Sequence, residues 1–118
     1  MDSIFEITLL MDFYGQLITK RQYMILDLHY NNDYSFGEIA ELLSISRQGV
    51  YDNIKKGKVL LNNFENKLGL VKKFLEQRTK IENTLKELSS INIENVQPAD
   101  RQKLKNIEKA LKEIMEVN

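Results

Sequence analysis

The sequence predicts an all-α protein, and two observations predict this class. Apolar residues recur every three or four positions over most of the chain, and residues that favour helix N-termini precede the runs. Only 5 glycines and 1 proline interrupt the 118 residues, too few for the many tight turns of a sandwich or barrel. A chain of this length, 42% hydrophobic, forms one compact unit with at most one appended element.

The first two helices are marked by residues that cap helix N-termini. Ser3 is placed to cap a helix that runs through apolar residues and ends at Gly15. Thr19 and Gln22 have the spacing of a capping box and start a second helix. We expect this helix to end at residues 31–33, Asn-Asn-Asp, because such side chains compete for backbone hydrogen bonds.

A short third helix and a longer fourth one follow with little chain between them. Ser35 caps the third helix, and Ser46 caps the fourth after an interruption at Ser44. Gly57 occupies an apolar slot of the fourth helix, where we expect a close contact with another helix. Two ends are open for the fourth helix: a C-terminal stop at Gly69, or continuation to about residue 88.

The C-terminal part predicts further helices. Residues 89–97 are polar and β-branched and predict a linker, after which Pro98 opens a last amphipathic helix. We therefore expect a helix-turn-helix domain with its N-terminal helix at residues 1–61, and a C-terminal helical extension at 62–118. The residues after Gly69 carry a narrow apolar stripe of the kind that forms a helix hairpin or a dimer interface. Because one small domain does not cover this stripe, we expect a homodimer. Its members are Val71, Phe74, Ile81, Leu85 and Leu88.

Composition excludes several classes of function. The chain has no cysteine, so it has no disulfide, thiolate nucleophile or cysteine-based zinc site. It shows no export signal and no run near the roughly 18 apolar residues of a membrane span, so we expect a cytoplasmic protein without a membrane partner. His29 is the sole histidine, and no P-loop or nucleophile–base pair is visible. We predict neither an enzyme nor a cofactor or metal.

Charge is balanced overall but not along the chain. The 17 basic and 17 acidic residues cancel, yet residues 1–45 hold 2 basic and 7 acidic side chains, a net charge of −5. Residues 46–80 hold 9 basic and 3 acidic side chains, a net charge of +6, and the remaining 6 and 7 nearly cancel. The neutral total argues against binding of polyanions by bulk charge, so any nucleic-acid contact must be local to the basic block.

Residues 35–56 carry the candidate site. A short capped helix, a three-residue turn and a second capped helix give the length pattern of a helix-turn-helix. Ala40 is small enough for two helices to cross closely, and Ser44 lies where the sharp turn usually has glycine. On the second helix, Arg, Gln and Asn side chains facing outward can pair with base edges, and Lys with phosphate. The candidate nucleic-acid-binding residues are Arg47, Gln48, Tyr51, Asn53, Lys55 and Lys56.

The same stretch resembles known families. Residues 19–61 are similar to region 4 of bacterial sigma factors, and the whole chain resembles the YlxM family of small bacterial proteins. Genes of that family lie next to those for the signal recognition particle GTPase and its receptor, so the resemblance implies a regulatory or accessory role in that pathway. The sigma-like positions are Thr19, Arg21, Gln22, Leu26, Tyr30, Ile39, Ala40, Leu43, Ile45, Ser46 and Val50.

Two alternative hypotheses for the function follow from these patterns and resemblances. The first is a regulatory DNA-binding helix-turn-helix protein that takes part in the signal recognition particle pathway, with DNA or RNA, or the particle's protein or RNA, as partner. The alternative is a protein-interaction accessory factor of the particle without sequence-specific DNA binding. Asp52 favours the alternative, because a carboxylate in the middle of the outward face repels phosphate. On that interpretation the basic block is only the solvated face of a long helix.

Overall fold

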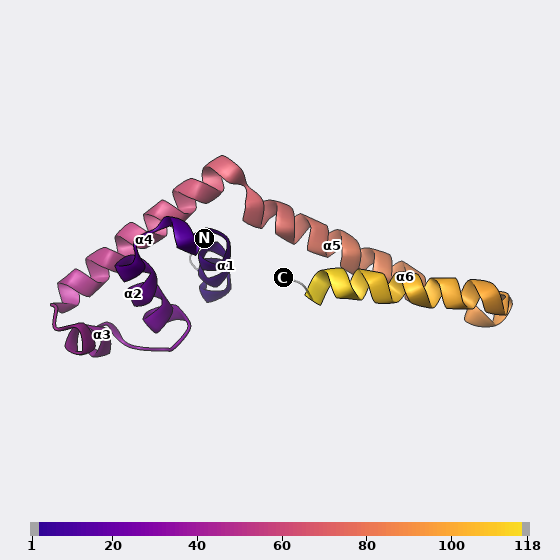
Figure 1. The fold of residues 1–118 in the computed structure, drawn as a ribbon, viewed down its shortest axis with the longest axis horizontal. Coiled ribbons are helices and arrows are strands. Elements are labelled where there is room, and N and C mark those ends of the chain that lie inside the picture. The colour runs from indigo at the N-terminus through magenta and orange to yellow at the C-terminus, as the bar shows by residue number, and fades with distance from the viewer. Residues whose placement is uncertain (1–2, 117–118) are drawn as a thin grey trace. The chain divides into compact units, whose positions relative to one another are not determined.

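The structure, a computed structural model, describes residues 3–116 and confirms the all-α class. Six α-helices and two short 3₁₀ turns make up the regular structure of these residues (Figure 1). None of the described helices is long and apolar enough to cross a membrane. In chain order the elements are α1 (Ile4–Tyr14), η1 (Gly15–Leu17), α2 (Lys20–Tyr30), α3 (Phe36–Leu43), α4 (Arg47–Leu68), α5 (Leu70–Ser89), η2 (Ile93–Asn95) and α6 (Pro98–Glu116).

The chain forms two compact units, Met1–Lys72 and Lys73–Asn118. The first unit holds α1 to α4 together with the first residues of α5, and the second holds the rest of α5 and α6. The boundary between a helix-turn-helix domain at residues 1–61 and a C-terminal extension at 62–118 stays a prediction.

Polar caps define where the helices of the first unit begin. Each of the four capping side chains accepts a hydrogen bond from the backbone N–H three residues later, which satisfies one of the free donors of a first helical turn. At α2 and α3 the bond is reciprocated, because Gln22 and Glu38 accept from the backbone of their cap residues. The caps predicted from the sequence are therefore confirmed at Ser3, Thr19, Ser35 and Ser46.

The core of the first unit lies along α4, against which α1, α2 and α3 all pack (Figure 1). Gly57 of α4 is buried, and a Cβ added there would lie only 2.9 Å from Cδ1 of Leu26 on α2. The close helix contact expected at Gly57 is thereby confirmed. The fully buried apolar side chains of this unit include Ile7, Leu10, Ile25, Leu26, Ile39, Val50, Leu61 and Val71.

The fourth helix ends at Gly69 rather than continuing. Gly69 adopts a left-handed conformation with φ of 62°, and its N–H donates to the Glu65 carbonyl at 2.8 Å. Helix α5 begins at the next residue, Leu70. Of the two ends left open by the sequence, the stop at Gly69 is the one that the structure has.

A buried carboxylate closes the joint between α4 and α5. Glu65 is only 8% exposed, and its side chain accepts hydrogen bonds from the backbone N–H groups of Val71 at 3.0 Å and Lys72 at 3.1 Å. Tyr14 of α1 donates its hydroxyl hydrogen to the same carboxylate and accepts from the Leu70 N–H at 3.1 Å. The first turn of α5 is thus capped by side chains from two other helices.

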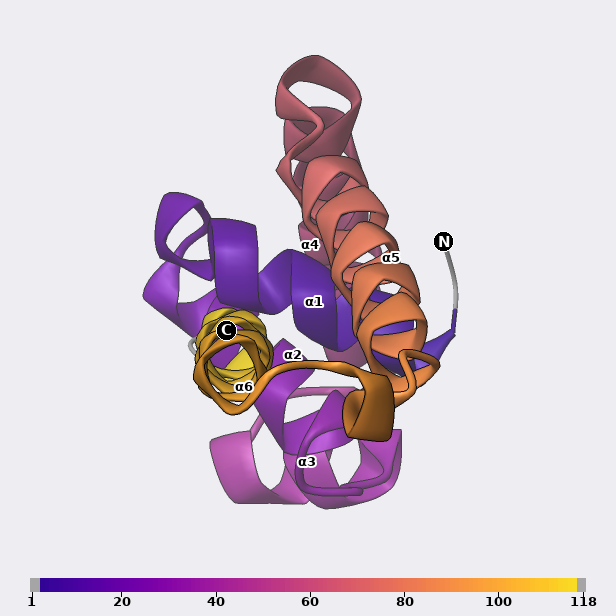
Figure 2. The ribbon, with the colours of Figure 1, turned by 90° about the vertical axis from the view of Figure 1, so that its right-hand side faces the viewer.

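The second unit contains α5 and α6, joined by a turn that holds η2 and is nearest the viewer in Figure 2. The predicted linker at 89–97 is confirmed as the break between these helices. Arg101 Nε donates to the Val96 carbonyl at 2.7 Å and ties the start of α6 to the turn. No described residue of α6 is buried, and Ile107 is 49% exposed. Helix α6 therefore leaves part of its apolar face open.

Candidate nucleic-acid interface

The turn between α3 and α4 is tight. Ser44 ends α3 in the left-handed region, with φ of 55° and ψ of 44°, at the position where glycine was the expected residue. The Ile45 N–H donates to the Ala40 carbonyl at 3.0 Å. The Ser46 side chain then accepts from the Gly49 N–H at 2.9 Å, which starts α4 at once. The two helices follow each other as a helix-turn-helix requires.

Buried side chains hold the two helices together and determine which side of α4 faces outward. Ile39 and Ala40 of α3 are buried, as are Val50 and Ile54 of α4. A helix turns by about 100° per residue, so positions between these apolar ones are carried to the opposite side. That opposite side of α4 carries polar side chains and is exposed.

Five of the six predicted binding residues are exposed on the first half of α4. Asn53 differs, because its side chain is half-buried and its Nδ2 donates to the Gly49 carbonyl of the same helix at 2.8 Å. We expected Asn53 to face outward, but it lies at the edge of the buried side, where its own backbone engages it. The exposed five are Arg47, Gln48, Tyr51, Lys55 and Lys56.

A side-chain hydrogen bond crosses the middle of this exposed face. Gln48 Nε2 donates to Asp52 Oδ1 at 3.0 Å, one helical turn further along. The bond occupies one amide hydrogen of Gln48 and leaves its second hydrogen and its oxygen available. Asp52 and Glu65 are the only carboxylates of α4, and Glu65 is buried. Asp52 is therefore the one negative charge that α4 presents on its exposed side.

Arg47 lies close to the start of α3. A Cβ added to Gly37 would lie 3.0 Å from Arg47 Nη2 and 3.1 Å from its Cζ. Both residues line an open hollow of about 480 Å³ together with His29, Ser35 and Phe36. His29 also contacts the Phe36 ring, with centroids 4.8 Å apart, and its Nδ1 lies 2.8 Å from the Tyr34 carbonyl. The guanidinium thus packs closely beside Gly37, and a Cβ at that position would require it to shift by a few tenths of an ångström.

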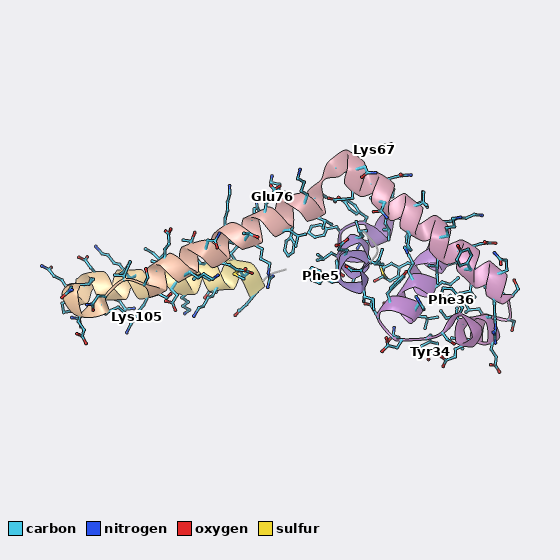
Figure 3. All side chains as sticks on the ribbon, turned by 180° about the vertical axis from the view of Figure 1, so that it is seen from behind. Phe5, Tyr34, Phe36, Lys67, Glu76 and Lys105 are labelled. Atoms are coloured by element: carbon cyan, nitrogen blue, oxygen red, sulfur yellow. The ribbon has the colours of Figure 1, made fainter. Side chains whose placement is uncertain are left out.

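An aromatic groove of about 420 Å³ lies beside the exposed face, lined by residues of α2, α3 and α4. Phe36, which is labelled at the start of α3 in Figure 3, and Tyr51 of α4 have ring centroids 6.3 Å apart. Lys58 Nζ lies 5.9 Å from the centroid of the Tyr30 ring at the end of α2. The other lining residues, all on α4, are Ile54, Lys55, Val59, Asn62 and Asn63.

The sequence did not reveal the aromatic groove. Tyr30 was interpreted as the last apolar position of one helix and Phe36 as the first of the next, which accounts for both without a ligand. At the groove the ends of two short helices lie against a long one. The spacing of residues within one helix does not predict such a contact between helices. The available signal was the position of both rings next to helix ends, just before the basic block.

Comparison with known proteins places this helix-turn-helix in a family. A family described as "Putative helix-turn-helix protein, YlxM / p13 like" matches residues 1–107 of the chain. The chain belongs to this family. The match covers the whole first unit and most of the second, and it confirms the family resemblance expected from the sequence. The YlxM / p13-like family is described as one of helix-turn-helix proteins.

Individual relatives in the YlxM / p13-like family are similar over most of the chain. A UPF0122 protein of Acetivibrio thermocellus is 56% identical over 116 residues, which are 98% of this chain and 99% of the relative. A UPF0122 protein of Thermoanaerobacter sp. strain X514 is 47% identical over 99% of this chain and 97% of its own length. The UPF0122 protein YlxM of Bacillus subtilis is 49% identical over 81 residues, 69% of this chain and 73% of that protein.

Proposed function

We propose that this protein binds nucleic acid, with duplex DNA as the main ligand, through the exposed face of α4, and that it acts as a regulator. One observation carries the proposal: the second helix of the helix-turn-helix exposes Lys55 and Lys56 on the side away from its buried residues, and Arg47 is exposed at its first turn, next to the start of α3. A helix of this kind enters the major groove, and its cations contact phosphates on either side. The similarity of residues 19–61 to sigma-factor region 4 supports DNA as the ligand.

The polar side chains on the exposed face of α4 have different roles in recognition. Lys55 and Lys56 supply phosphate contacts that carry no sequence information. Arg47 and Gln48 lie about two turns earlier, and their side chains have the donors that pair with guanine and adenine edges. Asp52 holds one Gln48 hydrogen and so orients the Gln48 amide on this face. Asn53 joins this set only after releasing its bond to the Gly49 carbonyl.

The salt dependence of binding tests the proposal. The measurement is the affinity for a short labelled duplex of mixed sequence, by fluorescence anisotropy over a series of salt concentrations. Each phosphate contact removed lowers the slope of log affinity against log salt by about one, so Lys55→Gln with Lys56→Gln should lower it by about two. The matched control is Lys103→Gln with Lys105→Gln on α6, which are also exposed. An unchanged slope in the α4 variant, or an equal change in the control, contradicts the proposal.

A part in the signal recognition particle pathway is the second candidate, as an accessory factor that binds the particle's protein. The resemblance to the YlxM family supports it, and so does exposed apolar surface on α1, where Ile4 and Phe5 are each 62% exposed (Figure 3). Binding of the purified particle protein and of its RNA should be measured separately. Phe5→Ser should weaken protein binding, whereas Leu68→Ser, another exposed apolar position, should not. Absence of binding to either component contradicts this candidate.

We also propose that the chain forms a homodimer through α6. Ile107 remains 49% exposed on this helix, and a second copy is a simple means of covering it. Ile107→Glu should shift the sedimentation profile from dimer to monomer, while Lys103→Glu, at an exposed polar position of α6, should leave it unchanged. A monomer mass at every protein concentration contradicts the homodimer.

A further inference from the structure

We propose that the aromatic groove binds an unpaired nucleotide, so that the protein recognises nucleic acid in which at least one base is outside a duplex. This inference rests on the proposed nucleic-acid function and makes it more specific. It follows from three properties of the groove: accessible rings, adjacent ammonium groups, and amide groups along one side.

The rings offer stacking surfaces. Tyr51 is 45% exposed, and Phe36 and Tyr30 are half-buried, so each ring is held by the fold and still accessible from one side. The Phe36 and Tyr51 planes are inclined by 61°, so the two rings do not cover each other's faces. A flat heteroaromatic base stacks on such a surface whatever its identity. Within a duplex the faces of a base are already covered by its neighbours, so the groove is suited to a base that has left the stack.

The charges of the groove suit a phosphate. Lys55 and Lys58 line it, and none of its lining residues is Asp or Glu. Lys58 Nζ lies over the Tyr30 ring, 5.9 Å from its centroid, so the groove presents a cation at the face of an aromatic ring. A nucleotide has the same pairing of groups, because its phosphate is joined to its base through the sugar. The combination of stacking rings and cations that follow the backbone is typical of single-strand binding.

Amide groups on α4 can reach the edge of a stacked base. Asn62 Nδ2 donates to the Lys58 carbonyl at 2.9 Å, and this bond orients the Asn62 side chain and leaves its oxygen as an acceptor. Asn63 is exposed beside it and also lines the groove. Hydrogen bonds from these amides to a base edge would add a modest base preference to the stacking.

The groove is continuous with the exposed face of α4 through residues that both share. Lys55 and its neighbour Val59 line the groove, and both also line a hollow on the other side with Asp52 and Lys56. One ammonium group therefore serves both surfaces. When the paired part of a nucleic-acid strand lies on the exposed face of α4, the next, unpaired nucleotide of that strand reaches the groove.

The experiment compares single strands with a duplex on a matched pair of variants. Tyr30 lies outside the exposed face of α4, so Tyr30→Leu removes a stacking ring and Tyr30→Phe retains it. The probes are labelled oligouridylate, labelled oligothymidylate and the mixed-sequence duplex. A lost base–aromatic stack lowers affinity roughly 5- to 150-fold, so Tyr30→Leu should weaken single-strand binding by that factor and duplex binding by less than about twofold. Tyr30→Phe should leave both within about twofold of the original.

The outcomes separate this inference from the proposed function. Duplex binding without single-strand binding overturns the groove proposal alone, and absence of binding to all probes overturns both. An equal loss for duplex and single strand in Tyr30→Leu shows that the ring only supports packing, and this also overturns the groove. The groove proposal is also overturned if an acidic peptide that contains tyrosine binds with higher affinity and displaces oligouridylate. If Tyr30→Leu does not fold, Lys58→Gln replaces it, and it should lower the single-strand salt slope by about 0.7.

The two single strands distinguish the source of the nucleotide. The groove as described contacts base and phosphate, which RNA and DNA share. Equal affinity for oligouridylate and oligothymidylate therefore supports recognition through these shared groups. Tighter binding of one of them also supports the groove, and it identifies whether RNA or DNA is the preferred source.

Discussion

Tyr14 and Glu65 lie 51 residues apart in the sequence and are joined by a hydrogen bond of 2.6 Å from the phenol hydroxyl to the carboxylate. The same carboxylate caps α5 by accepting from the Val71 and Lys72 N–H groups. One buried side chain therefore connects α1, α4 and the start of α5. A buried carboxylate with three donors is stable only while all three remain, since a buried donor without a partner is costly.

Removal of this carboxylate should destabilise the protein strongly. Glu65→Ala leaves the Val71 and Lys72 N–H groups and the Tyr14 hydroxyl without their acceptor, and we expect the free energy of unfolding to fall by about 2–4 kcal/mol. Urea denaturation followed by circular dichroism measures the change. Glu76→Ala, at an exposed position of α5, serves as control and should change it by less than about 0.5 kcal/mol. Equal losses in the two variants contradict this account.

The same group should make stability depend on pH in the acid range. Burial raises the pKa of Glu65, but the hydrogen bonds from Tyr14, Val71 and Lys72 outweigh burial, and the pKa is lowered from its usual 4.5. The unfolded chain is therefore protonated first as the pH falls. The stability contributed by the Glu65 charge is fully present above the usual value and is lost as the pH falls through the lowered one.

Comparison with an uncharged variant measures this pH dependence. Between about pH 7 and about pH 3, the difference in urea midpoint between the original protein and Glu65→Gln should shrink as the pH falls. Because Gln has no titrating carboxyl group, other acidic residues affect both proteins alike. A difference that stays constant over this range, or grows toward low pH, contradicts the sign argued here.

Two serines two positions apart should respond to substitution with opposite signs. Ser44 holds a left-handed conformation that glycine adopts without strain, so Ser44→Gly should stabilise by about 0.5–1 kcal/mol. Ser46 caps α4 through the Gly49 N–H, so Ser46→Ala should destabilise by about 1 kcal/mol. Thermal unfolding of both variants tests the pair. The same sign of shift in both contradicts the structure of this turn.

Asp52 should oppose nucleic-acid binding by its charge. Asp52→Asn keeps the shape of the side chain and removes the only exposed carboxylate of α4, so duplex affinity should rise roughly 2- to 5-fold at low salt. The gain should fade as salt is added, since exposed charges are screened. Anisotropy titrations at two salt concentrations measure both effects. Weaker binding in the variant indicates that Asp52 accepts a hydrogen bond from the ligand and contradicts simple repulsion.

The helix caps were predictable along most of the chain because each cap depends on residues that are close in sequence. The caps at Ser3, Thr19, Ser35 and Ser46 each need only a partner three residues away, and the sequence shows both. The division between α4 and α5 was only half predictable. Gly69 is a strong stop signal, but apolar spacing continues past it, and periodicity alone does not detect a single left-handed residue.

Long-range polar contacts were not predictable from these patterns. Glu65 falls on the buried stripe of α4, four residues after Leu61, but a carboxylate at such a position is ordinarily expected in solvent. Its partner Tyr14 belongs to another helix, and no local spacing connects the two. For Asn53 the sequence predicted an outward-facing side chain, and the spacing of residues does not show the hydrogen bond from its amide to the Gly49 carbonyl.

The contact between Gly37 and Arg47 has an evolutionary consequence. A side chain at position 37 competes for the space next to the Arg47 guanidinium. Alanine there requires this flexible group to shift by only a few tenths of an ångström, whereas a family member with a much larger residue at position 37 must hold its arginine in another rotamer. Residue 37 on the first helix of the pair would then alter which bases the second helix selects, without itself lying at the ligand.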